Sequence, residues 1–437
     1  MNGIIRLMGY TGPMVTVIAS PIFGLALALP YSYMVMELCS AFPEDGGFTV
    51  WVLNAFGPFW GFQIGYCAWI ADTLKMAFVT RLILRSTLAT FHLSPPNTLT
   101  SIVYRVIFIV VAGAPAALKL RHVAGIAVHI SVLLLASLLI YVIWALACVE
   151  YPERLTEIRR QHSSIDTMSG RIIQYGHYFI DWKRLLEIMM EIYNGFQSIS
   201  AIGSGVLRPG KTFPKAIWVT FVASAIIYSV PAHAIVISSR WHWSRYTTVA
   251  FADIASSIGA TPLRMISFCL SICTNFGQIM CRLLSQSYLL CGMAENELFL
   301  SIFANKNQLT QAPISALVFS AVCICPFLLI DSERVFGVMN AFTCTTQILI
   351  ICTVIRLRRT APLVARPYKF PGNNFVLVLV AIPQLIVLGF TLWAVLSTQW
   401  TARFTLALIT PGLLYGFIQW RWLRKKRCET SNTLEWF

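Results

Sequence analysis

The residues that could do chemistry in this chain are polar side chains placed inside long apolar stretches. One such stretch, 185–206, carries Glu187 and Glu191 at positions i and i+4 and then becomes rich in glycine and serine. Broken backbone survives inside a membrane only where it is buried or lines a wet cavity, and its free amides and carbonyls can then bind a substrate. We therefore predict an interrupted helix with a pocket at the break. The predicted contacts there are Asn194, Gly195, Ser198 and Ser200.

Two alternatives stay open for this stretch. It could be a surface loop that runs into a short re-entrant segment. Glu187 and Glu191 could also pair with Lys183 and Arg184 at the membrane interface. We favour that pairing for Glu187 more than for Glu191.

A second set of polar side chains recurs along 263–292 at intervals that keep them on one helical face. This set consists of Asn275, Gln278, Arg282 and Gln286. An arginine at the centre of a span costs about 2.5–3.5 kcal/mol on insertion scales, so a carboxylate or water must compensate it. We predict that this face forms the opposite wall of the pocket, and the alternative is a hydrogen-bond ladder between helices.

Asp72 and Lys75 form the third polar site, on the stretch 57–80. They are three residues apart and could neutralise each other. Alternatively, Lys75 extends outward and leaves Asp72 to meet Arg282. Burial disfavours the charged form of a carboxylate, so Asp72 and Glu191 are the candidates for carrying a coupling proton.

The elements that position these residues follow from composition. Of the 437 residues, 57% are apolar and only 12% are charged, against roughly 45–50% and about 25% in soluble proteins. We predict an all-α polytopic membrane protein, because a stretch of about 20 apolar residues crosses ~30 Å of hydrocarbon. Eleven stretches qualify: 14–36, 57–80, 102–118, 123–148, 185–206, 216–238, 263–292, 312–330, 335–355, 375–396 and 403–420.

Charge and cysteine content narrow the possible partners. The net charge of +15 lies mostly in short basic clusters beside apolar spans, which is typical of contact with lipid headgroups rather than nucleic acid. The cysteines lie mostly inside apolar runs and show no spacing of metal ligands, so no metal or cofactor is expected. We find no GxSxG or HExxH pattern, so an enzyme is not expected.

Lysine and arginine indicate the orientation. The end of the chain carries Arg421, Arg424, Lys425, Lys426 and Arg427, which places the C-terminus in the cytosol. We predict one transmembrane domain over 1–422 and a short basic cytosolic tail over 423–437. The polar stretch 149–182 is then extracytoplasmic, and a solvated loop is favoured there over a cap on a gate. Eleven spans would leave Met1 outside the cytosol.

Several motifs also carry a family likeness. They are 37–52 (ELCSAFPEDGGFTVWV) with 56–63 (FGPFWGFQ), 198–200 (SIS) with 211–216 (KTFPKA), 290–295 (LCGMAE), and 355–358 (IRLR) with 366–371 (RPYKFP). Together they resemble the amino acid–polyamine–organocation superfamily, and more narrowly its eukaryotic polyamine-uptake branch. The likeness runs from about residue 10 to 396.

The resemblance implies a leucine-transporter-like inverted repeat of twelve helices, in which the unwound first and sixth helices hold the substrate. The stretch 185–206 would be the sixth helix and 263–292 the eighth. The family's first helix finds no counterpart among the eleven stretches, which explains the odd count. Positions where the polyamine branch places carboxylates carry other residues here: Lys75, Gln197, Gly205, Arg282 and Gln286.

The resemblance therefore predicts a secondary active, proton-coupled transporter of amino acids or polyamines that works by alternating access in the plasma membrane. Its partners would be a small-molecule substrate, protons and the lipid bilayer. Arg282 could meet a substrate carboxylate, which favours amino acids over polyamines. The alternative is an N-terminally truncated, transport-incompetent permease homologue.

Overall fold

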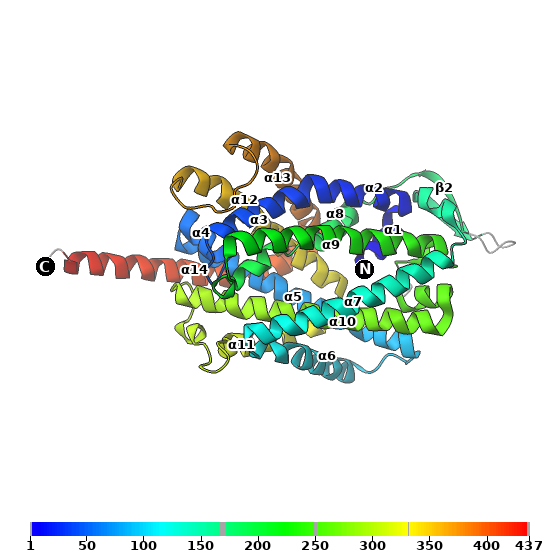
Figure 1. The fold of residues 1–437 in the computed structure, drawn as a ribbon, viewed down its shortest axis with the longest axis horizontal. Coiled ribbons are helices and arrows are strands. Elements are labelled where there is room, and N and C mark those ends of the chain that lie inside the picture. Colours follow the sequence, from blue (N-terminus) through cyan, green and yellow to red (C-terminus); the bar gives the residue numbers. More distant parts are fainter. Residues whose placement is uncertain (1, 166–171, 248–250, 331, 435–437) are drawn as a thin grey trace.

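The computed structural model describes residues 2–165, 172–247, 251–330 and 332–434. Its helices run mostly along the long axis of an elongated bundle (Figure 1). Within the described residues, eight helices are long and apolar enough to cross a membrane. The predicted all-α membrane fold is confirmed. The eight are Pro13–Ala41, Thr98–Ala117, Leu120–Ala147, Pro209–Ser238, Phe251–Glu295, Arg334–Thr360, Asn374–Leu396 and Gln399–Lys425.

The other three predicted stretches are also helical. Each has a feature that makes it less apolar or less continuous than the eight. The helix α5 (Pro58–Phe91) carries charged side chains along its length. The stretch 185–206 is divided into α8 (Trp182–Ile192) and the 3-10 turns η4 (Phe196–Ala201) and η5 (Gly203–Gly205). The helix α11 (Ile314–Ile324) is short and continues as the turn η8 (Cys325–Leu329).

The remaining elements complete the bundle in chain order. The first span consists of α2 (Pro13–Phe23), a π-helical turn η1 (Gly24–Ala28) and α3 (Leu29–Ala41). The others are α4 (Phe48–Phe56), α6 (Thr98–Gly113), η2 (Ala114–Ala117), α7 (Leu120–Ala147), η3 (Pro152–Thr156), α9 (Pro209–Ser238), η6 (Trp243–Arg245), α10 (Phe251–Glu295), η7 (Ser301–Ala304), α12 (Ser332–Thr360), α13 (Asn374–Leu396) and α14 (Gln399–Leu434).

The helix α10 is two helices in series. Gly259 and Ala260 have non-helical backbone angles, and Pro262 follows. Proline lacks the amide that would continue the hydrogen-bond ladder, and glycine tolerates the bend, so the kink is encoded locally. The predicted span 263–292 is the part of α10 beyond this kink.

A ten-residue helix, α1 (Asn2–Thr11), precedes all the predicted spans. At about 1.5 Å per residue it is too short to cross a bilayer, so a search for spans does not detect it. It is nevertheless part of the core, because Ile4, Ile5, Leu7 and Met8 are at most 2% exposed. It packs along α8, and its first residues lie about halfway along the bundle (Figure 1). The structure therefore differs from the sequence analysis, which assigned no helix here.

The stretch 149–182 is folded rather than a plain loop. It contains η3 and an antiparallel hairpin of β1 (Arg160–Ile165) and β2 (Ile172–Tyr178) at one end of the bundle (Figure 1). Arg154 is buried and donates to the carbonyl of Ser239 at 2.5 Å. Arg159 donates to the carbonyl of Gly9 on α1 at 2.8 Å. These arginines anchor the described part of the stretch to α1 and to the residues after α9, while most of its described residues are exposed.

The opposite end of the chain also differs from the predicted tail. The helix α14 continues to Leu434 and extends well beyond the other helices (Figure 1). Residues 423–434 are therefore a continuation of the last helix.

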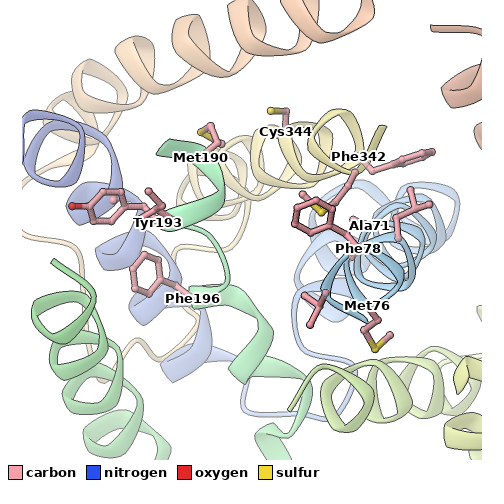
Figure 2. Close-up of a cluster of buried hydrophobic side chains, with 14 of the residues drawn as sticks. Ala71, Met76, Phe78, Met190, Tyr193, Phe196, Phe342 and Cys344 are labelled. Atoms are coloured by element: carbon pink, nitrogen blue, oxygen red, sulfur yellow. The ribbon is translucent and has the colours of Figure 1, made fainter. Parts of the chain in front are cut away.

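The apolar core holds the interrupted helix in place. Side chains from α5, from α8 and its following turn, and from α12 gather in one buried cluster (Figure 2). Figure 2 labels Ala71, Met76, Phe78, Met190, Tyr193, Phe196, Phe342 and Cys344 in this cluster. Because α8 is short, this packing, rather than a continuous helix, fixes the position of its polar residues.

Candidate functional site

The predicted helix break is present. The helix α8 ends at Ile192, and Gly195 has a φ of +112°, a conformation that glycine adopts without steric cost. Asn194 lies inside the break, where its Oδ1 accepts hydrogen bonds from Gln197 and Gln347, each at 3.1 Å. The break therefore exposes backbone and amide groups that a continuous helix would satisfy internally.

A cavity of about 270 Å³ lies beside the break. Five helices contribute to it, namely α1, α5, α8, α9 and α10. Its polar lining consists of Lys75, Glu191, Asn194, Tyr228, Ser271, Thr274, Asn275, Gln278 and Arg282. A cavity of this size with convergent polar groups can hold a small molecule.

Two ion pairs lie at the cavity. Lys75 of α5 is 2.5 Å from Oε1 of Glu191 on α8, and the two side chains are 8% and 20% exposed. Arg282 of α10 pairs with Asp72 of α5. Each pair joins α5 to another helix. Lys75, Glu191 and Arg282 line the cavity, and Asp72, which lies outside the lining, neutralises Arg282.

These pairs decide between the alternatives that the sequence left open. Asp72 meets Arg282, as one alternative predicted. Lys75 does not extend outward, because it is buried and bound to Glu191. Glu187 pairs with Arg184 at 3.1 Å, as predicted, and does not line the cavity.

The structure brings some of the predicted site residues together and separates others. Asn194, Asn275, Gln278, Arg282 and Glu191 line the cavity, whereas the remaining five lie outside it. Those five are Gly195, Ser198, Ser200, Gln286 and Asp72.

Three of the residues outside the cavity make hydrogen bonds elsewhere in the bundle. The carbonyl of Ser198 accepts a hydrogen bond from Ser285 at 2.8 Å, and Ser200 donates to the carbonyl of Gln197 at 2.7 Å. Gln286 donates to the carbonyl of Trp69 at 2.9 Å and to the hydroxyl of Thr73 at 2.7 Å. For Gln286 the structure therefore shows the helix–helix hydrogen bonds of the alternative reading.

The sequence analysis missed several cavity residues. Ser271 lies one turn before Asn275 and Thr274 one turn before Gln278 on the same helix, so following the polar face back by one turn from these two residues would have found them. Tyr228 is a single tyrosine in an apolar run, and Gly3 belongs to the helix that the span search did not detect. Nothing in the local pattern around Tyr228 singles it out.

A second polar cluster lies at the end of the bundle from which α14 emerges, around the loop 42–47 between α3 and α4 (Figure 1). Asp45 accepts hydrogen bonds from Ser204 Oγ at 2.6 Å and from Lys306 Nζ at 2.8 Å. Lys306 also lies 2.9 Å from Glu295 Oε1. Burial opposes the charge of Lys306, but its hydrogen bonds to the two carboxylates raise the pKa of Lys306.

This cluster holds the turns η4 and η5, which follow the break in the interrupted helix. Asp45 and Ile202 form an isolated β-bridge. Gly47 has a φ of +48°, and a Cβ there would lie 2.2 Å from Oγ of Ser200. The loop 42–47 can therefore approach the turns η4 and η5 only because a glycine occupies this position.

Comparison with known proteins agrees with this arrangement. A family model described as "Amino acid permease" matches residues 2–414. The chain is 27% identical to "Polyamine transporter PUT1" of Oryza sativa subsp. japonica, over 97% of this chain and 76% of that protein. It is 25% identical to "Polyamine transporter RMV1" of Arabidopsis thaliana, over 92% of this chain and 78% of that protein. A shorter likeness is to "Glutamate/serine transporter AimA" of Bacillus subtilis, which is 24% identical over 46% of this chain and 39% of that protein.

Proposed function

The chain belongs to the amino acid permease family, and on this premise we propose that it is a secondary active transporter of amino acids or polyamines, coupled to protons and working by alternating access. Family and relatives are transporters rather than enzymes. The observation that carries the proposal is the polar cavity beside the break after Ile192, in a bundle with eight helices that are long and apolar enough to cross a membrane. Transporters of this construction bind their substrates where a helix is interrupted near the middle of the membrane.

Alternating access needs elements that can move relative to each other. The turns η4 and η5 are bound to the loop 42–47 through Asp45, whereas α8 packs on α1 and α12. The break at Asn194 and Gly195 separates these two attachments and is the natural hinge between them. We propose that access to the cavity changes as the attachments move about this hinge.

The charges around the cavity favour an amino acid over a polyamine as substrate. Glu191, in the cavity wall, and Asp72, the partner of Arg282, are already paired with cations of the protein itself. A zwitterion can meet a net-neutral wall, whereas a polycation needs unpaired carboxylates. Arg282 is the proposed partner of the substrate carboxylate, because a guanidinium offers several donors and Asp72 takes only part of them.

The coupling proton is proposed to reside on Asp72 or Glu191. Each is partly buried beside the cavity and bound to a cation of another helix. Protonation would neutralise the carboxylate and release that cation, so the charge state is linked to contacts between helices.

We also propose that the protein lies in the plasma membrane. The basic residues from Arg421 onward support a cytosolic C-terminus.

The test is uptake into proteoliposomes that contain the purified full chain. A panel of radiolabelled amino acids and polyamines would be offered with and without an inward proton gradient. We expect saturable uptake of at least one amino acid, stimulated by the gradient and abolished by an ionophore. No uptake of any compound above that of protein-free liposomes would contradict the proposal.

A further inference from the structure

Two residues of α8 line the cavity, Glu191 and Ile192, and Glu191 is the charged one. Glu191 lines a cavity of about 270 Å³ that Asn194, Tyr228 and Asn275 also line. An anionic group beside neutral hydrogen-bonding groups is suited to bind an organic ammonium ion.

That position is already filled from within the protein. The ammonium of Lys75 lies 2.5 Å from the Glu191 carboxylate, and the lysine side chain is only 8% exposed. The two residues are 116 positions apart in the chain, so the pair links α5 to α8 through the tertiary structure and not through a local turn. Lys75 is itself one of the residues that line the cavity.

We propose that Glu191 forms the core of an amine-binding subsite that the Lys75 ammonium occupies as a tethered ligand, so that Lys75 excludes amines from the cavity. A free amine must displace a group held beside the carboxylate at an effective concentration on the order of millimolar or more. It would also enter a cavity that holds a second cation, Arg282. Lys75 is in this sense a residue that determines specificity.

The inference rests on the proposed function in one respect, namely that this cavity is where the substrate binds. Its test does not need transport, because a ligand that binds the folded state raises thermal stability in a saturable way. Failure of uptake and failure of the inference are therefore distinguishable.

The experiment measures the thermal stability of the purified full chain in lipid nanodiscs with increasing n-propylamine or putrescine. Lys75→Ala removes the atoms that n-propylamine would replace. We expect saturable stabilisation of this variant at a concentration at least about tenfold lower than any effect on the wild type. The alcohol 1-propanol, which has the same carbon skeleton without the charge, should have no such effect.

Three further variants separate the subsite from general effects of charge. Lys75→Arg keeps the tethered cation and should respond like the wild type. Lys75→Ala combined with Glu191→Gln should lose the response to amines. Lys183→Gln removes a lysine of α8 that lies outside the cavity and serves as the matched control; it should also respond like the wild type.

Two results would overturn the inference. One is a wild-type protein that putrescine stabilises as strongly as it stabilises the Lys75→Ala variant. The other is a response of the Lys75→Ala variant that persists in the double variant. If Lys75→Ala does not fold, Lys75→Gln should show the same increased response to amines. The wild-type measurement tests, without any variant, whether amines are excluded from the cavity.

Discussion

Glu37 of α3 and Arg358 of α12 form a two-point ion pair that is almost sealed from solvent. Nε and Nη2 of Arg358 donate to the two carboxylate oxygens at 2.9 and 2.5 Å, and the two side chains are at most 3% exposed. Nε of Arg366 lies 3.3 Å from the same carboxylate, and the backbone amide of Phe370 donates to it at 2.8 Å. Motifs separated by more than three hundred residues therefore meet in one buried contact.

Replacing Glu37 by glutamine should strongly destabilise the protein. The substitution leaves the guanidinium of Arg358 buried without its counter-ion, which costs about 3–5 kcal/mol when one partner of a buried pair is removed. Thermal unfolding of the purified protein measures the effect. Glu44→Gln changes an exposed carboxylate nearby and is the control; equal unfolding temperatures for the two variants would contradict the role of the pair.

Replacing Gly47 by alanine should separate the loop 42–47 from the interrupted helix. Its Cβ would overlap Ser200, whose Oγ and carbonyl carbon would lie 2.2 and 2.5 Å away. Gly57 has a φ of +88° but no atom within 4 Å of its Cβ position, so Gly57→Ala measures a backbone cost alone, on the order of 1–3 kcal/mol. We expect Gly47→Ala to lower the unfolding temperature clearly more than Gly57→Ala. Equal losses would show that the close approach to Ser200 is unimportant.

Replacing Arg282 by glutamine should impair uptake of amino acids. Loss of a hydrogen-bonded charge contact costs about 1.5–3 kcal/mol, which is roughly a tenfold to hundredfold increase in KM. Uptake into proteoliposomes measures it, and Arg264→Gln on the same helix, outside the cavity, is the control. Uptake restricted to putrescine and unchanged by Arg282→Gln would refute the preference for amino acids.

Neutral substitutions of the two carboxylates should reveal the coupling proton. We expect Glu191→Gln or Asp72→Asn to leave substrate exchange while removing the stimulation of uptake by an inward proton gradient, because the variant cannot titrate. Glu187→Gln, on the same helix as Glu191 but outside the cavity, should keep that stimulation. Full stimulation of uptake in both Glu191→Gln and Asp72→Asn would exclude these carboxylates as proton carriers.

The contacts of Lys306 predict that its contribution to stability decreases at alkaline pH. The pKa of Lys306 is raised in the folded state by its bonds to Asp45 and Glu295, which outweigh burial. Its stabilising contribution is therefore complete below the unfolded pKa of about 10.4 and is lost as the pH rises through the folded value. The difference in unfolding temperature between wild type and Lys306→Gln should be constant from about pH 7 to 9 and shrink above about pH 10.

Lys369→Gln is the control for this alkaline effect, because Lys369 is an exposed lysine. Its unfolding temperature should follow that of the wild type at every pH. A Lys306 contribution that disappears already near neutral pH would contradict the assignment.

Much of the architecture was predictable because it depends on local properties of the chain. Apolar stretches of span length become helices wherever backbone groups must be satisfied without water. The break after Ile192 was also predictable, because glycine and serine are concentrated there. The helix α1 was not predictable as a span, because it has only ten residues and gains its burial from packing on other elements, among them α8, α2 and η6.

The sequence by itself determined which segments enter the membrane, where one of them is interrupted and which polar residues lie within reach of the interruption. Only the tertiary structure decided that Lys75 pairs with Glu191 and Asp72 with Arg282, and that Gln286 faces another helix instead of the cavity. The reason is physical: hydropathy and helix periodicity depend on near neighbours in the chain, whereas an ion pair depends on how helices from distant parts of the chain are rotated and packed.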